Sequence, residues 1–349
     1  MIRPDSIHRI LVIRRKAMGD ALVTLPALHQ LSTAFPQAQI DLVIDRPFAP
    51  LIANLARGIE VIAWPPPEKG LLSWLARLHR SRYDLVIDYL GNPRTAVWTA
   101  ATGAPLRVGY DLPRRGWAYN VRVPRNRLGD RALAQFAGEA FLDPLRALGL
   151  DPGPWQPGHG DMAVDESGLG ENYRRWVKTW LTGDRPRIAL MFSATWPAKA
   201  WPARHGADCY RQLVNAGLDP LLVTGPGDEQ LEADLKREAP EASLAPPTTL
   251  AELAHLLSHC TVFVGTDNGA RHLATLLGVP TVTVFGPTDP QGWNLNDPLH
   301  VAVTHDVHCA PCNLTSCPVE GHPCLEKLGA DGVVSAVQGI LHGGERGTS

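Results

Sequence analysis

The sequence predicts an α/β protein built from two successive doubly wound domains. Short apolar runs alternate with segments of helical periodicity along both halves of the chain. Residues 151–160, which include three prolines and three glycines, separate these halves. The length of 349 residues suits two ordinary domains. Because strands separated by helices form parallel βαβ units, we expect two Rossmann-like domains facing each other across a ligand-binding cleft.

The first domain is assigned to residues 1–160. Its expected strands are the apolar, β-branched runs at 9–14, 39–44, 61–63 and 84–89. Helices are expected over 21–35 and 71–79, where apolar residues recur at helical spacing. Pro26 is compatible with the first of these helices because it falls near the first turn.

The second domain is assigned to residues 161–349 and repeats the alternation. Its expected strands cover 187–192, 220–224, 261–265 and 281–285. Its expected helices cover 172–181, 203–216, 230–238, 250–258 and 269–277. Gly217 is a typical terminator for the helix that precedes it.

The net charge of −2 hides opposite charges in the two halves. Residues 1–150 hold 20 basic and 12 acidic side chains, whereas residues 151–349 hold 13 and 23. A basic half suits nucleic acid, a membrane surface or an anionic substrate, and uneven surface charge without function is the alternative. No apolar run reaches about 18 residues, so no transmembrane helix is expected. The opening residues lack a secretory leader pattern, so we expect a cytoplasmic protein.

The loop after the first strand, KAMGDALVTLP at 16–26, contains a candidate catalytic acid. Asp20 falls at the carboxyl end of the strand, where doubly wound domains bind ligands. A carboxylate there could accept a proton from a hydroxyl group as a general base. The alternative is that Asp20 only caps the following helix. The loop has neither a P-loop nor a complete GxGxxG pattern.

The loop SATWPAKAWP, at 193–202, carries groups that suit a phosphate ligand. Ser193 and Thr195 supply hydroxyl groups, and Lys199 supplies a cation. Because this loop follows a strand of the second domain, these side chains should lie at the ligand-binding edge of the sheet. A surface loop whose tryptophans pack locally is the alternative.

A third loop, within GTDNGARHLATLLGVP at 265–280, leads into a helix near Gly269. The first N–H groups of such a helix can bind an anion. His272 lies one turn further and could face the same ligand. Asp267 could instead cap this helix, but capping alone does not explain the other polar residues of the turn.

Taken in order, these segments resemble glycosyltransferase family 9, the ADP-heptose:lipopolysaccharide heptosyltransferases. The matching stretches are ILVIRRKAMGDALVTLPAL, WPAKAWP, TGPGDE, VGTDNGARHLATLLGVPTVTVFGPTDP and CAPCNLTSCPVEGHPC. They follow the family's order and approximate spacing over nearly the whole chain. The cysteine-bearing end looks more like the heptosyltransferase II branch. The resemblance implies the GT-B architecture, with two Rossmann-like domains across a cleft.

The resemblance also implies residue roles. It places the catalytic base on Asp20 and the lysine that contacts the donor diphosphate on Lys199. The other implied donor contacts are a hydroxyl-bearing loop, an acid for the ribose, two threonines near the adenine, and a helix start. These residues are Ser193, Thr195, Glu229, Thr248, Thr249, Asp267, Asn268, Gly269 and His272. Asn268 stands where relatives often have Ser or Thr.

The implied reaction is the inverting transfer of heptose from ADP-heptose to a hydroxyl of the lipopolysaccharide inner core, without a cofactor for catalysis. The first domain would bind the acceptor and the second the donor. One alternative is a family member with another sugar donor, or with a glycan or protein acceptor. Another is a GT-B-like nucleotide-sugar epimerase or hydrolase. Asp20 and Lys199 disfavour a binding protein that has lost catalysis.

An arginine-rich stretch of the first half is expected to hold the anionic acceptor. Seven arginines fall at 107, 114, 115, 122, 125, 127 and 131, with aromatic residues interleaved. Arginine forks suit phosphate and carboxylate groups. A solvated loop is the alternative, and the acidic second half disfavours nucleic acid. We expect contact with the cytoplasmic face of the inner membrane, and acceptor binding by Arg107, Arg114, Arg115 and Arg122.

Four cysteines cluster near the end of the chain, with the spacing C-x2-C-x4-C-x6-C. Four thiols this close in a cytoplasmic protein suit a structural zinc or iron site. A compact turn of reduced cysteines without metal is the alternative. The residues are Cys309, Cys312, Cys317 and Cys324.

Overall fold

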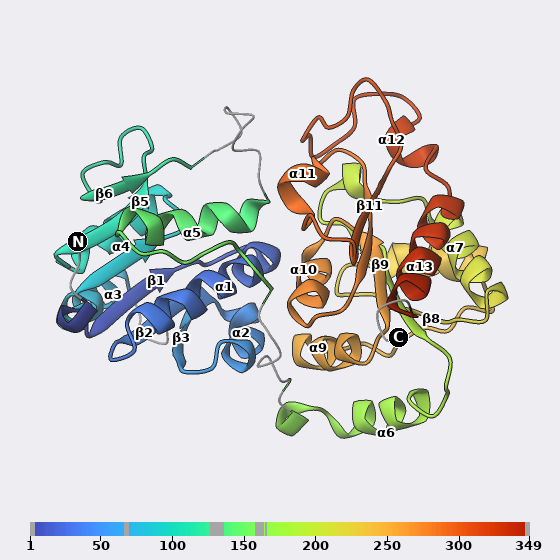
Figure 1. The fold of residues 1–349 in the computed structure, drawn as a ribbon, viewed down its shortest axis with the longest axis horizontal. Coiled ribbons are helices and arrows are strands. Elements are labelled where there is room, and N and C mark those ends of the chain that lie inside the picture. Colours follow the sequence, from blue (N-terminus) through green and yellow to red (C-terminus); the bar gives the residue numbers. More distant parts are fainter. Residues whose placement is uncertain (1–3, 66–69, 126–135, 158–163, 165, 346–349) are drawn as a thin grey trace. The chain divides into compact units, whose positions relative to one another are not determined.

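In the computed structural model the chain divides into two compact units, Met1–Ala163 and Val164–Ser349. The structure describes residues 4–65, 70–125, 136–157, 164 and 166–345. Each unit contains a parallel sheet with helices packed on it (Figure 1).

The sheet of the first unit has six parallel strands in the order β3-β2-β1-β4-β5-β6. This is the strand order of the Rossmann fold, and it reverses direction between β1 and β4. Ile13 at the end of β1 pairs with Asp88 at the end of β4, so both strands end at the same level. The strands are β1 (Arg9–Ile13), β2 (Gln39–Asp45), β3 (Ile59–Trp64), β4 (Leu85–Asp88), β5 (Leu106–Tyr110) and β6 (Val121–Val123).

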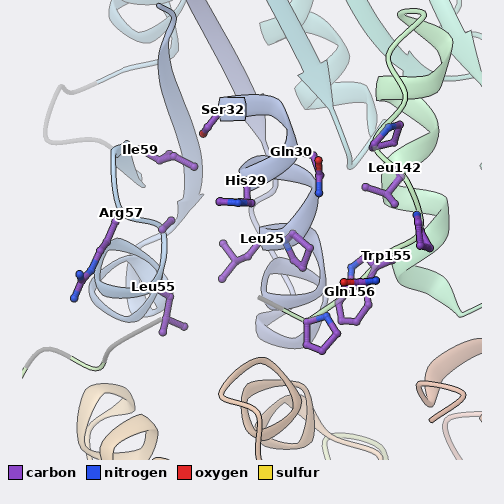
Figure 2. A pocket seen from close by; sticks show the side chains of 15 residues that line it. Leu25, His29, Gln30, Ser32, Leu55, Arg57, Ile59, Leu142, Trp155 and Gln156 are labelled. Carbon is purple, nitrogen blue, oxygen red and sulfur yellow. The ribbon is translucent and has the colours of Figure 1, made fainter. Parts of the chain in front are cut away.

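The helices of the first unit are α1 (Met18–Ala34), α2 (Ala49–Leu55), α3 (Leu71–Arg80), α4 (Pro93–Ala101) and α5 (Ala137–Ala147). α1 packs against α5, and α3 packs against α4. The start of the expected interdomain connection lies against α1, where the indole N–H of Trp155 donates to the carbonyl of Val23 at 2.9 Å. A cavity of about 800 Å³ also opens along α1, and Leu25, Leu55 and Trp155 are among the residues that line it (Figure 2).

The sheet of the second unit has five parallel strands in the order β11-β10-β9-β7-β8, which reverses between β7 and β9. The strands are β7 (Arg187–Met191), β8 (Asp219–Leu222), β9 (Val262–Thr266), β10 (Thr281–Phe285) and β11 (His300–Thr304). The helices are α6 (Glu171–Trp180), α7 (Ala203–Asn215), α8 (Glu229–Glu238), α9 (Leu250–Ser258), α10 (Gly269–Leu276), α11 (Pro290–Trp293), α12 (Pro323–Glu326) and α13 (Ala330–Glu345).

Both reversals are topological switch points. In an open parallel sheet, the loops after the two strands at such a point run to opposite faces and leave a crevice at the carboxyl edge. The first unit therefore offers a crevice beyond β1 and β4, and the second unit offers one beyond β7 and β9. We expect functional side chains on these loops.

Candidate functional site

Asp20 lies at the switch point of the first unit, in the first turn of α1. The N-cap residue of α1 is Ala17, so Asp20 is not itself the N-cap, but it accepts the N-cap N–H from the third helical position and thus caps α1 in that way. Its Oδ2 atom accepts the N–H of Ala17 at 3.3 Å and pairs with Nη2 of Arg14 at 2.7 Å. The Asp20 side chain keeps 28% exposure, so its carboxylate is accessible to a ligand.

Arg14 directly follows β1 and is buried beneath this carboxylate. Its Nη1 donates to the carbonyl of Tyr89, just beyond β4, at 2.7 Å. Its guanidinium lies 5.1 Å from the ring centre of Phe141 on α5. Arg14 therefore joins β1, the loop after β4 and α5 to Asp20.

Asp88, the last residue of β4, shapes the second loop of this crevice. It is buried, and it accepts the N–H groups of Leu90 and Gly91 at 2.9 and 3.0 Å. The hydroxyl of Tyr119 donates to its other oxygen at 2.7 Å. Burial raises the pKa of the Asp88 carboxyl. Gly109 on β5 is required here, because a Cβ at this position would overlap the Tyr119 ring.

The expected acceptor arginines do not all lie at this edge. Arg107 sits near the start of β5 and donates to the carbonyls of Ala104 and Ala118 at 2.6 and 2.9 Å. Its guanidinium is thus occupied by backbone carbonyls. The structure does not bring it to Asp20. Arg115 donates to the carbonyl of Gly91 at 3.0 Å and lies beside the loop after β4.

Arg114 lies between β5 and β6, and Arg122 lies in β6. Both side chains are exposed. Arg114 accepts the indole N–H of Trp117 with its carbonyl at 3.1 Å, which leaves its guanidinium uninvolved in that contact. Arg122 donates to the carbonyl of Gly116 at 3.1 Å and lies 3.8 Å from Asp111. Arg127 and Arg131 fall outside the described residues.

A cavity of about 510 Å³ opens beyond β5 and β6, and Arg122 and Arg125 both line it. The Arg125 guanidinium lies 6.0 Å from the ring centre of Tyr110, the last residue of β5. Burial raises the pKa of Tyr110 to about 12, against the opposing charges of Arg14 and Arg125. Arg125 and Arg14 therefore both lie within electrostatic range of Tyr110.

Lys199 and Asp267 meet at the switch point of the second unit. Lys199 ends the short turn Pro197–Lys199 after β7, and Asp267 follows β9. The ammonium of Lys199 donates to Oδ2 of Asp267 at 2.6 Å and lies 4.5 Å from the ring centre of Trp196. The sequence pointed to both residues, and the structure joins them.

Asp267 is buried and has two further side-chain partners. It accepts Nη2 of Arg271 at 3.0 Å and the hydroxyl of Thr288 at 2.8 Å. Burial acts to raise the pKa of Asp267, but the positive charges of Arg271 and Lys199 prevail and lower it to about 2. Asp267 is thus ionised at neutral pH and pairs with two cations.

Asn268, rather than Asp267, is the N-cap of α10, so the capping alternative for Asp267 is wrong. The Asn268 side-chain oxygen accepts the N–H of Arg271 at 3.1 Å. Its amide N–H group donates to the carbonyls of Met191 and Ser193, both at 3.2 Å. Asn268 therefore ties the start of α10 to the loop after β7, and Gly269 becomes the first helical residue.

His272 is buried behind this cluster. Arg271 donates to its Nε2 atom at 2.9 Å, so this nitrogen is an acceptor. Burial and the charge of Arg271 hold the pKa of His272 well below its usual value. His272 is consequently neutral and supports Arg271 as a hydrogen-bond acceptor.

The remaining expected donor residues occupy neighbouring loops. Ser193 donates to Asp228, which precedes α8, while Thr195 is exposed. Glu229 is an exposed first residue of α8 and accepts the N–H of Gly227 at 3.2 Å. Thr249 is the N-cap of α9, and its hydroxyl accepts the N–H of Glu252 at 3.2 Å; Thr248 precedes it and is half-buried. In the described chain, no hydrogen bond links Glu229, Thr248 or Thr249 to the Lys199–Asp267 pair.

The cysteine cluster gives no support to a metal site. Within the described ranges, no three His, Cys, Asp or Glu side chains form a group that could hold a metal ion. Cys309, Cys312, Cys317 and Cys324 are free thiols. Cys324 is part of the apolar core of the second unit, and the Cys317 thiol donates to the carbonyl of Val319 at 3.5 Å.

The segment that carries these cysteines is hydrogen-bonded to the loops that contain Lys199 and Thr288. The N–H of Ala198, next to Lys199, donates to the carbonyl of Thr315 at 3.1 Å. The N–H of Asn313 donates to the carbonyl of Pro287, next to Thr288, at 2.7 Å. The segment therefore holds both loops in place. Among the described residues, none of the helices combines the length and the apolar character of a transmembrane span.

Four site residues escaped sequence reasoning: Arg14, Asp88, Arg271 and Thr288. Arg14 directly follows β1, Asp88 ends β4, Arg271 lies in the first turn of α10, and Thr288 lies in the loop after β10. That placement is itself a usable signal, because buried charges require partners. For Arg14 and Asp88 the partners, Tyr89 and Tyr119, lie on segments far apart in the sequence, so sequence reasoning could not identify them.

Comparison with known proteins places this geometry in a family. Residues 72–322 match the family model described as glycosyltransferase family 9 (heptosyltransferase). The chain is 28% identical over 327 residues to lipopolysaccharide heptosyltransferase 1 of Pseudomonas aeruginosa, covering 88% of this chain and 87% of that protein. It is 25% identical over 294 residues to lipooligosaccharide heptosyltransferase 2 of Haemophilus influenzae, covering 81% and 84%.

Solved structures agree in fold. A family 9 glycosyl transferase from Veillonella parvula matches with a TM-score of 0.76 and 20% identity, covering 96% of this chain and 97% of that chain. The E. coli ADP-heptose lipopolysaccharide heptosyltransferase II matches with a TM-score of 0.70 and 20% identity, covering 97% and 99%. These matches and the two parallel sheets confirm the predicted GT-B fold class. Because relatives of both branches have similar identities, the heptosyltransferase II assignment stays a prediction.

Proposed function

The chain belongs to glycosyltransferase family 9 (heptosyltransferase), and from this premise we propose that it transfers heptose from ADP-heptose to a hydroxyl of the lipopolysaccharide inner core. Its relatives are named as lipopolysaccharide and lipooligosaccharide heptosyltransferases. The observation that carries the proposal is that each unit has a charged cluster at its switch point. One contains an accessible carboxylate, and the other contains a lysine beside a helix start.

The second unit binds the donor in this proposal. Lys199 faces the diphosphate, and the first N–H groups of α10, at Gly269 and Ala270, contribute the positive end of the helix. These groups stabilise the charge that develops as the bond between the anomeric carbon and the diphosphate oxygen breaks. Ser193, Thr195, Glu229, Thr248, Thr249, Asp267, Asn268 and His272 complete the proposed donor site.

The first unit supplies the base and holds the acceptor. Asp20 accepts the proton of the acceptor hydroxyl while the oxygen attacks the anomeric carbon from the side opposite the leaving ADP, which inverts the configuration. The cavity lined by Arg122 and Arg125 suits the anionic groups of the acceptor. Arg114 and Arg115 extend this basic surface, whereas the proposed role of Arg107 has less support because it braces the backbone.

The acceptor also suggests where the protein works. A lipid-linked core would bring the first unit to the cytoplasmic face of the inner membrane as a peripheral enzyme. The basic charge of residues 1–150 is consistent with an anionic membrane surface. Cytoplasmic localisation and membrane contact are parts of the proposal.

The deciding experiment incubates the protein with ADP-heptose and truncated core acceptors and measures product masses. Addition of one heptose residue to the acceptor, with release of ADP, would support the proposal. Release of ADP without a glycosylated product would favour a hydrolase, and an isomerised nucleotide sugar would favour an epimerase. Transfer only from another nucleotide sugar, or only to another glycan or a protein, would assign a different substrate within the family.

A further inference from the structure

We propose that Arg14 is a positioning residue that fixes the carboxylate of Asp20 so that only its Oδ1 atom is presented to the acceptor hydroxyl. The inference rests on the proposed function, in which Asp20 is the general base. It goes beyond that function by assigning a role to a buried arginine and by naming the oxygen that takes the proton.

Arg14 is held from three directions. Its backbone follows β1, its Nη1 donates to the Tyr89 carbonyl at 2.7 Å, and its guanidinium lies 5.1 Å from the Phe141 ring centre. Only 8% of the residue is exposed. A guanidinium anchored to a carbonyl and an aromatic ring has little freedom to follow a moving partner, so Arg14 can serve as a fixed support.

The contacts of Asp20 divide its two carboxylate oxygens. Oδ2 receives both Nη2 of Arg14, at 2.7 Å, and the N–H of Ala17, at 3.3 Å. Oδ1 has no hydrogen-bond or ion-pair partner among the residues that the structure describes. One oxygen is therefore saturated by the protein, while the other keeps its lone pairs for a ligand.

Arginine suits this role better than lysine would. Its planar fork donates to the Tyr89 carbonyl and to Asp20 at the same time, whereas a lysine ammonium lacks this rigid geometry. Arginine also remains protonated throughout the reaction and cannot compete with Asp20 as the base. An Arg14→Lys variant should keep the charge but lose part of the alignment.

Arg15 provides a matched control. Its Nε donates to Asp45 at 2.8 Å, and its guanidinium lies 5.3 Å from the Trp64 ring centre and 5.6 Å from that of Trp98. It thus combines an ion pair with aromatic contacts, as Arg14 does. No contact of the described residues joins it to Asp20.

The test compares Arg14→Gln, Arg14→Lys, Arg15→Gln, Asp20→Asn and the double variant Arg14→Gln/Asp20→Asn in heptose transfer to a truncated core acceptor. We expect Arg14→Gln to lower kcat about 10- to 100-fold, because small misplacements of a reacting group have effects of this size. ADP affinity, measured by calorimetry, should not change. Arg14→Lys should recover part of the rate, and Arg15→Gln should keep kcat near that of the parent protein.

The double variant separates positioning from a general structural effect. If Arg14 acts through Asp20, Arg14→Gln should cost little further rate once Asp20 is Asn. Equal losses in both backgrounds, or a normal kcat for Arg14→Gln, would overturn the inference. If Arg14→Gln does not fold, Arg14→Lys decides: a lowered kcat with unchanged ADP affinity supports positioning, and a normal kcat overturns it. Near-normal turnover of Asp20→Asn would instead refute Asp20 as the base in the proposed function.

Discussion

At the scale of single residues, Asp20 decides whether the first unit carries the base. We expect Asp20→Asn to retain donor binding but to lose turnover by about 10²- to 10⁴-fold, because an amide cannot accept the acceptor's proton. Product mass spectrometry would measure transfer, and calorimetry with ADP would measure binding. A folded Asp20→Asn protein with near-normal turnover would leave this residue with only its structural contacts, the hydrogen bond from Ala17 and the ion pair with Arg14.

Lys199 is the corresponding test of the second unit. We expect Lys199→Ala to weaken ADP binding by about 10- to 100-fold, the usual worth of a charged hydrogen bond, and also to slow transfer. Lys236, on the exposed face of α8 and paired with Glu232, offers a lysine control whose replacement should leave ADP affinity unchanged. Unaltered ADP affinity of Lys199→Ala would contradict the diphosphate role.

The lowered pKa of Asp267 predicts that the free energy of unfolding depends on pH. Its pKa is lowered to about 2 in the folded protein, below the value of about 3.9 in an unfolded chain. Asp267 therefore contributes stability above pH ~4, and this contribution, about 2 kcal/mol, is lost as pH falls from ~4 toward 2. Denaturant unfolding between pH 6 and pH 2 should show a smaller loss of stability for Asp267→Asn than for the parent protein. Equal losses would contradict the assignment.

At the scale of elements, the sequence predicted the strands that form both switch points. The apolar runs of β1, β4, β7 and β9 were long enough to identify, and the loops after β1, β7 and β9 contain predicted site residues. β5 and β6 were not predicted, because β5 contains Arg107 and Gly109 and β6 has only three residues. α2, α4, α5, β11 and α13 were also not predicted. The partners of Arg14 and Asp267 depended on how these elements pack.

Gly109 interrupts the apolar pattern of β5, and its substitution tests whether the Tyr119 ring requires a glycine there. A Cβ at this position would overlap the buried Tyr119 ring, whose hydroxyl donates to Asp88. We expect Gly109→Ala to lower the free energy of unfolding by about 1–3 kcal/mol, as overpacking usually does. Gly183, where an added Cβ meets nothing within 4 Å, is a matched control that should change stability little. Similar unfolding curves for both variants would show that the Tyr119 ring can move aside without lowering the free energy of unfolding.

At the scale of the whole molecule, the opposite charges of the two halves bear on acceptor recognition. Residues 1–150 carry a balance of +8 (20 basic minus 12 acidic), and residues 151–349 carry −10 (13 minus 23). The sequence could predict this charge asymmetry, but it could not predict which arginines have side chains available to bind an acceptor. Arg107 braces the backbone, whereas Arg122 and Arg125 line a cavity beyond the carboxyl ends of their strands.

We therefore expect Arg122→Ala combined with Arg125→Ala to raise the acceptor KM at low salt and to leave ADP affinity unchanged. Both side chains are exposed, so their attraction for an anionic acceptor is screened beyond about 8–10 Å at physiological ionic strength. The difference from the parent protein should accordingly shrink as salt is added. Arg237→Ala on α8 removes another exposed arginine, from the acidic unit, and should not alter acceptor KM. An unchanged KM for the double variant at low salt would contradict acceptor binding at this cavity, because electrostatic attraction is strongest under that condition.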